Sequence, residues 1–148
     1  MEVTRELLLS CLAVPRWADE VLAGHPYADV AGALAAAAAA SCDLTDEELV
    51  QALSGHPRIG ERGGAWSRVE QSGIDLRADG TAARLAFGNA TYEERFNRMF
   101  IVRAVGRDAE EILSELQRRL RNDDATERAE TVESLRQIAL LRLEAALS

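Results

Sequence analysis

Lysine is absent from this sequence of 148 residues, and all 17 of its basic residues are arginine. A Schiff base with a carbonyl substrate or with pyridoxal phosphate requires a lysine amine. The composition therefore excludes both lysine Schiff-base chemistry and pyridoxal phosphate enzymes.

Cysteine and histidine are scarce, with two of each in the chain. Cys11 and Cys42 lie far apart and lack the spacing of metal ligands, so we expect free thiols in a reducing, cytoplasmic compartment. With two histidines in separate segments and no cysteine pair, no zinc site is predicted.

The net charge of -8 and the pI near 4.8 reflect a deficit of basic residues. Nucleic acids and anionic membranes favour basic surfaces, so neither partner is expected. The chain shows no signal-peptide pattern and no apolar run long enough to span a bilayer. A small anionic ligand is still compatible with this composition, because one arginine can bind it locally.

Sustained period-two alternation of β-branched residues is also missing, whereas helical periodicity recurs. Together with 47% hydrophobic residues, this predicts a single all-α domain over residues 1–148, a bundle of seven to eight helices. The expected helices cover residues 3–12, 15–24, 28–40, 45–54, 67–73 and 81–100, a segment after Asp108, and residues 124–146. Gly88 is expected to bend the sixth of these.

Two helix starts carry a capping-box pattern, in which a short polar side chain is followed three residues later by glutamate. Thr45 with Glu48 marks one, and Asp108 with Glu111 marks the other. We expect both helices to begin at these positions.

His56 lies in the polar, glycine-containing stretch Gly55-His56-Pro57-Arg58-Ile59-Gly60. Pro57 prevents the preceding helix from continuing, so His56 sits just past a helix end on a stiff turn. Histidine exchanges protons near neutrality and is a candidate acid or base. A lone histidine is more often structural, and His25 also precedes a proline, so both interpretations stay open.

Glu70 and Gln71 combine an acceptor with a group that both accepts and donates hydrogen bonds. This pair suits a ligand with amide or ureido groups. Ser67-x-x-Glu70 is also a capping-box pattern, in which case Glu70 would bond to its own helix. The residues alone do not decide between the two.

Arg142 projects between Leu135 and Ile138, on the apolar arc of the last helix. Glutamate and glutamine occupy the opposite side of that helix. An arginine in this position must reach water, pair with a buried acid or meet an anionic ligand. A structural pair and a ligand are equally favoured.

The apolar run Phe100-Ile101-Val102-Arg103-Ala104 follows a predicted helix. Core packing is the simpler interpretation. Backbone amides at a helix break could also bind a ligand.

The order and spacing of these segments resemble the family of 2-oxo-4-hydroxy-4-carboxy-5-ureidoimidazoline (OHCU) decarboxylases of urate breakdown. The matching pieces are Gly55-His56-Pro57-x-Ile59-Gly60, Ser67-x-x-Glu70-Gln71-x-x-Gly73, Asn89-x-x-Tyr92-x-x-x-Phe96-x-x-x-Phe100-Ile101-Val102, Glu111-Ile112-Leu113, Arg119-Leu120-x-Asn122 and Leu141-Arg142-Leu143.

The resemblance implies an all-helical homodimer that uses no cofactor. It implies that His56 donates a proton and that Glu70 acts with it in catalysis. It places substrate contacts on Pro57, Ser67, Glu70, Gln71, Phe100, Ile101, Val102, Ala104 and Arg142.

The implied reaction is decarboxylation of the ureidoimidazoline to (S)-allantoin by a carbon-carbon lyase. One alternative is a decarboxylase of a related ureido acid. Another, from a different class, is a catalytically silent helical binding or dimerisation module.

Overall fold

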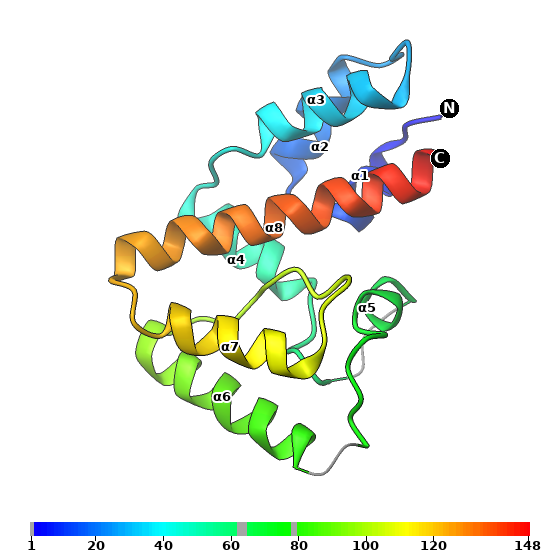
Figure 1. The fold of residues 1–148 in the computed structure, drawn as a ribbon. Coiled ribbons are helices and arrows are strands. Elements are labelled where there is room, and N and C mark those ends of the chain that lie inside the picture. The colour runs from blue at the N-terminus through cyan, green and yellow to red at the C-terminus, as the bar shows by residue number, and fades with distance from the viewer. Residues whose placement is uncertain (1, 62–64, 78–79) are drawn as a thin grey trace. The chain divides into compact units, whose positions relative to one another are not determined.

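The computed structural model describes residues 2–61, 65–77 and 80–148, without the side chains of residues 65–67. These residues form eight α-helices and contain no strand, which confirms the predicted all-α class. The helices are α1 (Arg5–Cys11), α2 (Pro15–Ala23), α3 (Val30–Ala40), α4 (Asp46–Ser54), α5 (Ala65–Glu70), α6 (Thr81–Phe96), α7 (Ala109–Arg119) and α8 (Asp124–Leu147) (Figure 1). Within the described ranges, no helix is long and apolar enough to cross a membrane.

The contacts divide the chain into two compact units. Unit 1 comprises Met1–Gly55 with Val132–Ser148, and unit 2 comprises His56–Thr131. Helix α8 contributes its first two turns to unit 2 and the remainder to unit 1. The prediction of one domain over residues 1–148 stays a prediction, and each unit is described by itself.

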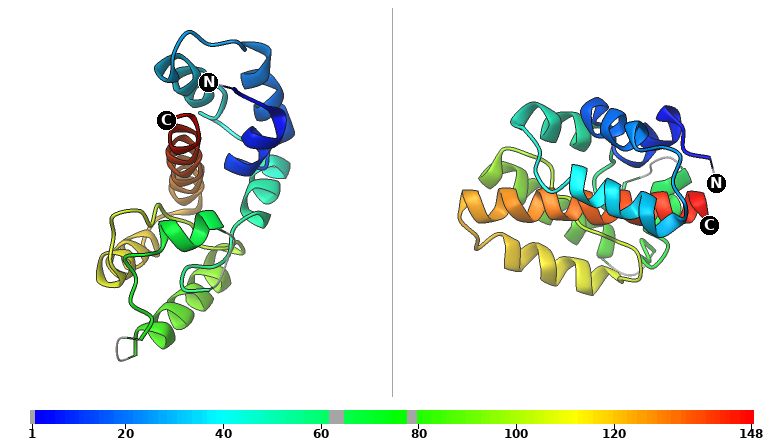
Figure 2. Two further views of the ribbon diagram at one scale, coloured as in Figure 1. Left: turned by 90° about the vertical axis from the view of Figure 1, so that its right-hand side faces the viewer. Right: turned by 90° about the horizontal axis from the view of Figure 1, so that it is seen from above.

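Unit 1 packs α2 against both α1 and α3. Trp17 is fully buried on α2, and its indole Nε1 donates to the Ala37 carbonyl of α3 at 2.9 Å. The C-terminal part of α8 is tied to the same unit by Arg136, whose Nε donates to the Ala38 carbonyl at 3.2 Å. In both figures the end of α8 lies near the start of the chain (Figures 1 and 2).

Both predicted capping boxes are present. The Thr45 hydroxyl accepts from the Glu48 amide and the Glu48 carboxylate accepts from the Thr45 amide, and Asp108 and Glu111 do the same at α7. Glu48 also accepts two bonds from the Arg16 guanidinium. The Arg16 partnership lowers the pKa of Glu48 despite its burial.

Unit 2 is built on α6 and α7, which lie side by side and run in the same direction (Figure 1): Arg84 pairs with Glu110 near their starts, and Arg95 bonds to the Leu120 carbonyl near their ends. A Cβ at Gly88 would lie 2.3 Å from Leu116 Cδ2, so glycine allows the close approach of the two helices. Helix α6 ends at Phe96 because Asn97 adopts the left-handed conformation, with φ of 57°. The predicted extension to Phe100 is therefore wrong.

Helix α5 begins at Ala65, two residues before Ser67. An N-cap residue precedes the first helical turn, so Ser67 does not cap this helix. The capping-box interpretation of Ser67 and Glu70 is thus wrong, and Glu70 is instead the last residue of α5.

Candidate functional site

The segment after α4 is fixed by side chains from two other parts of unit 2. Ile59 is buried, and its carbonyl accepts from the Asn89 Nδ2 amide of α6 at 2.9 Å. The next amide, of Gly60, donates to Gln71 Oε1 at 2.9 Å. Gly60 has φ of 92°, a backbone conformation that favours glycine. The backbone three and four residues beyond His56 is therefore held in one conformation.

Gln71 links this segment to the end of α5. Its amide oxygen is engaged by Gly60, so the direction of its NH2 group is set by the backbone. Glu70 precedes it and is half-buried, as are His56 and Pro57. The side chain of Ser67 lies outside the described residues. The structure thus joins Gln71 to the segment that carries His56.

The segment between α6 and α7 meets the first one through the core. Phe100, Ile101, Val102 and Ala104 are all buried. Phe100, Val102 and Ala104 share one hydrophobic cluster with Ile59. The expected core packing is confirmed for these residues, and the cluster brings together two of the segments singled out in the sequence.

A buried ion pair supports the second segment. Arg119 on α7 is 1% exposed and Glu127 on α8 is 0% exposed. Arg119 Nε lies 3.0 Å and 2.9 Å from the two Glu127 carboxylate oxygens. Arg119 Nη1 donates to the Ile101 carbonyl at 2.8 Å. Arg119 is not among the predicted site residues, although it follows Ile112 by seven residues and so shares the buried face of α7.

Tyr92 completes the cluster around the ion pair. Its hydroxyl donates a short hydrogen bond to Glu127 Oε2. Burial, and then the hydrogen bond to Glu127, raise the pKa of Tyr92 to about 12. The hydroxyl therefore stays protonated at neutral pH and remains a donor.

Arg142 belongs to unit 1 and is 6% exposed. Leu135 and Ile138 are buried with it, which confirms its predicted place on the apolar arc of α8. Arg142 Nη1 donates to the Ser10 carbonyl near the end of α1, at 3.3 Å. A buried guanidinium is thus present on the apolar arc of α8.

Two pockets lie on the helices of unit 2. One, of about 210 Å3, adjoins the first segment and is lined by Arg58, Ile59, Gly60, Glu61, Ala82, Ala86, Asn89, Ala90 and Glu93. Arg58 is held beside it by hydrogen bonds to both carboxylate oxygens of Glu93.

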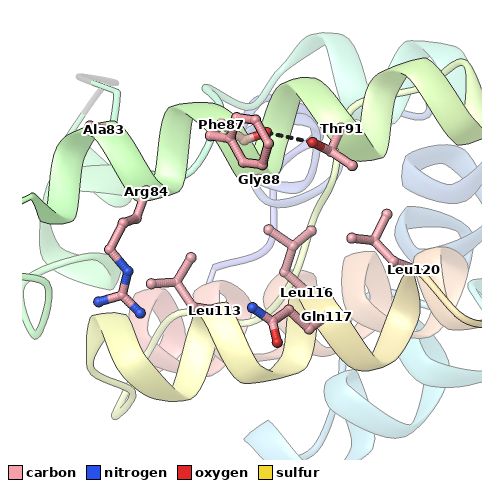
Figure 3. Close-up of a pocket in the computed structure, with 9 residues that line it drawn as sticks. All are labelled: Ala83, Arg84, Phe87, Gly88, Thr91, Leu113, Leu116, Gln117 and Leu120. Atoms are coloured by element: carbon pink, nitrogen blue, oxygen red, sulfur yellow. Dashed lines mark hydrogen bonds between the residues drawn. The ribbon is translucent and has the colours of Figure 1, made fainter.

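The other pocket, of about 400 Å3, is apolar and lies between α6 and α7 (Figure 3). Leu113, Leu116 and Leu120 line one side, and Phe87 lies across from them with 76% of its surface exposed. This pocket contains none of the residues predicted to bind substrate.

In chemical terms, unit 2 contains a half-buried imidazole at His56, a half-buried carboxylate at Glu70 and an oriented amide at Gln71. Such a set can exchange a proton and bind N–H and C=O groups of a small polar ligand. No group of three or more His, Cys, Asp or Glu side chains is placed to hold a metal ion in the described part of the chain.

Comparison with known proteins identifies relatives of this chain. Residues 2–144 match the sequence model of the OHCU decarboxylase family. A 2-oxo-4-hydroxy-4-carboxy-5-ureidoimidazoline decarboxylase of Amia calva is 43% identical over 82 residues, which are 54% of this chain and 47% of that protein. The match thus spans about half the length of that relative.

A second relative matches over a longer stretch. The enzyme of the same name from Haloferax volcanii is 28% identical over 133 residues, covering 87% of this chain and 79% of that protein.

Solved structures share the fold. A crystal structure of OHCU decarboxylase in the presence of (S)-allantoin superposes with a TM-score of 0.82 at 21% identity, covering 97% of this chain and 98% of that one. A crystal structure of (S)-allantoin synthase gives a TM-score of 0.71 at 16% identity, covering 97% of this chain and 49% of that one. The helical fold is therefore that of these proteins, and the match over residues 2–144 shows that the chain belongs to the OHCU decarboxylase family.

Proposed function

We propose that this protein is a carbon-carbon lyase that decarboxylates 2-oxo-4-hydroxy-4-carboxy-5-ureidoimidazoline to (S)-allantoin in urate breakdown. The observation that carries the proposal is membership of the family over residues 2–144. The hydrogen bonds that fix Ile59 and Gly60 support it, because they hold the segment that carries His56 next to Gln71.

The reaction requires no external electron acceptor. The carbon that bears the carboxylate is adjacent to an imine carbon of the same ring. When the bond to the carboxylate breaks, its electron pair moves toward that imine, the imine nitrogen takes up a proton, and carbon dioxide leaves. The ring hydroxyl then becomes the carbonyl of the product, and a proton is added to the former imine carbon. The protein must orient the substrate and deliver this proton to one face.

We assign the proton and hydroxyl chemistry to His56, assisted by Glu70. Glu70, Gln71 and Ser67 would bind the ureido and ring N–H groups, with Pro57 beside them. The oriented NH2 group of Gln71 supports its assignment.

The buried segment Phe100, Ile101, Val102 and Ala104 would form the apolar wall and supply backbone groups. Its burial supports this role. Arg142 would bind an anionic or carbonyl oxygen of the substrate, and its burial and fixed charge support that role.

We also propose a cytoplasmic homodimer. Both cysteines are free, one of them exposed, which suits a reducing compartment. Exposed Phe87 beside an apolar pocket suits an interface. Light scattering after size exclusion measures the dimer directly, and a monomeric mass would reject it.

Circular dichroism of freshly generated substrate, with and without the protein, tests the reaction. The expected result is a faster appearance of optically active allantoin of S handedness. A spontaneous rate with racemic product would identify the chain as a silent binding module. Faster loss of a different ureido acid would point to a related decarboxylase.

A further inference from the structure

Arg119 and Glu127 form a buried ion pair, and the attraction between two buried charges is largely offset by the free energy of removing them from water. Both side chains are almost fully removed from water. Burying two charges carries a desolvation penalty, and apolar residues of similar size often stabilise a core equally well. The pair therefore calls for a reason other than stability.

The contacts of Arg119 supply that reason. Its Nη1 donates to the Ile101 carbonyl at 2.8 Å, and its guanidinium carbon lies 5.0 Å from the centre of the Phe100 ring. Arg119 thus holds both the backbone and a side chain of consecutive residues in the segment between α6 and α7. Five donors in a rigid plane make arginine suited to such a fixed, multiple contact.

Three further groups hold the guanidinium and its partner in place. Thr131 Oγ1 accepts from Arg119 Nη2 at 3.2 Å, and Asn122 Nδ2 donates to Glu127 Oε1 at 3.1 Å. The Tyr92 hydroxyl donates to Glu127, and the Tyr92 ring lies edge-on to Phe100 with centroids 5.2 Å apart. The chain of contacts from Tyr92 through Glu127 and Arg119 therefore returns to Phe100.

We infer that Arg119 is a positioning residue, which fixes the backbone at Phe100 and Ile101 for substrate binding. The inference rests on the proposed function of that segment. Glu127 and Tyr92 set the position of the guanidinium. The product stereocentre forms by protonation of one face of the substrate. A shift of the segment at Phe100 and Ile101 would therefore lower both the reaction rate and the enantiomeric excess of the product.

Arg119→Lys and Tyr92→Phe test the inference, with Arg118→Gln as the matched control. Lysine keeps the charge of Arg119 but cannot bond to Glu127 and to the Ile101 carbonyl at the same time with the geometry of a planar guanidinium. Arg118 is the neighbouring arginine and forms exposed ion pairs with Glu115 and Glu130. The control therefore removes an arginine from the same helix without touching Ile101.

We expect kcat per folded molecule to fall about 10–10²-fold in Arg119→Lys, because a small misplacement of substrate is costly. Tyr92→Phe should lower it about fivefold, the equivalent of one hydrogen bond. In both variants the enantiomeric excess of allantoin should drop, whereas Arg118→Gln should match the wild type. A merely structural role would reduce the folded fraction and leave handedness unchanged.

Hydrogen exchange provides a readout that does not depend on turnover. The amides of residues 100–104 should exchange faster in Arg119→Lys and Tyr92→Phe than in the control. Unchanged exchange, or kcat and handedness equal to those of the control, would overturn the inference. If Arg119→Lys does not fold, Tyr92→Phe decides alone. If the wild type has no activity, the proposed function fails, and the exchange data still decide whether Arg119 holds the segment.

Discussion

Buried and half-buried side-chain hydrogen bonds reach different backbone carbonyls in the two compact units. In unit 1, side chains donate to carbonyls in the last turns of helices: Trp17 to Ala37, Arg136 to Ala38 and Arg142 to Ser10. These carbonyls lie within the last four residues of α3 and α1, where a helix supplies fewer backbone partners of its own. In unit 2, Asn89 and Arg119 donate instead to carbonyls of the connections, at Ile59 and Ile101. At the surface this difference does not hold, because Arg16 of unit 1 also bonds to the Asp43 carbonyl of a connection, and Arg95 of unit 2 bonds to the Leu120 carbonyl at the end of α7.

A hydrogen bond to a carbonyl at a helix end and a hydrogen bond to a carbonyl in a connection have different structural effects. A helix end is shaped by its own helix, and a donor there only satisfies a carbonyl. A connection has no such internal order, so a buried side chain that bonds to it selects its conformation. The connections fixed in this way are those that carry the residues proposed to bind substrate.

The largest expected effect is that of His56→Asn in the first connection. The variant should fold normally, since asparagine is polar and His56 is only half-buried. Its rate of decarboxylation should fall about 10²–10⁴-fold, the usual contribution of a general acid or base. Circular dichroism of the product measures this. Wild-type formation of optically active allantoin would remove His56 from the mechanism.

The Arg142→Leu variant tests whether Arg142 of unit 1 binds substrate or only hydrogen-bonds to a carbonyl at a helix end. If Arg142 binds the substrate, kcat/KM should fall about 10–10²-fold, as for loss of a charged hydrogen bond. The melting temperature without ligand should change little, because leucine suits the buried arc. Thermal melts with and without allantoin measure both quantities.

The opposite result for Arg142 is equally clear. A loss of roughly 3–5 kcal/mol in unfolding free energy with normal turnover would show that it serves a buried structural contact. Arg136→Leu is the control, since Arg136 also reaches a helix end of unit 1.

Asn89→Ala and Trp17→Phe compare the two targets directly, because each loses one hydrogen bond of 2.9 Å to a carbonyl. Both should lower the free energy of unfolding by about 1–3 kcal/mol. Only Asn89→Ala should also reduce activity per folded molecule, since it releases the Ile59 carbonyl. Equal activities in the two variants would contradict the distinction between hydrogen bonds at helix ends and hydrogen bonds that fix the conformation of a connection.

The smallest expected effect concerns pH and the ion pair of Glu48 with Arg16 in unit 1. Arg16 lowers the pKa of Glu48 from 4.5. The stabilisation is thus fully present above that value and is lost as the pH falls through the folded-state pKa. Arg16 is partly exposed, so the contribution is about 1 kcal/mol at most.

Glu48→Gln isolates that contribution from other carboxylates. The pKa values of Glu115 and Glu130 in unit 2 are also lowered, by Arg118. The wild type and the Glu48→Gln variant should therefore differ in melting temperature at pH 6 and converge toward pH 3. A constant difference across that range would show that the charge of Glu48 is unimportant.

Local patterns predicted the fold well because helix starts are encoded in neighbouring residues. The capping boxes at Thr45 and Asp108 are confirmed. The predicted end of α6 at Phe100 is wrong because the apolar pattern continues to that residue, whereas Asn97 turns the backbone into the left-handed region. Asparagine tolerates the left-handed conformation, so Asn97 is itself a local signal of a helix end.

Contacts between distant segments account for the rest. A bend of α6 at Gly88 stays a prediction, and the neighbour Leu116, on α7, gives a separate reason why a side chain is disfavoured there. Arg119 lies on a face already identified as buried, yet its partner Glu127 is on a different helix. Sequence periodicity shows which face is buried and gives no information about which residues meet there.

The division of the chain has a consequence for biosynthesis. Unit 2 is one continuous segment, so all of its residues are available once Thr131 has been translated. Unit 1 joins residues 1–55 to residues 132–148, and its contact between Arg142 and Ser10 spans most of the chain. Because synthesis proceeds from the N-terminus, we expect the first four helices to lack the α8 part of their core until residues 132–148 have been made.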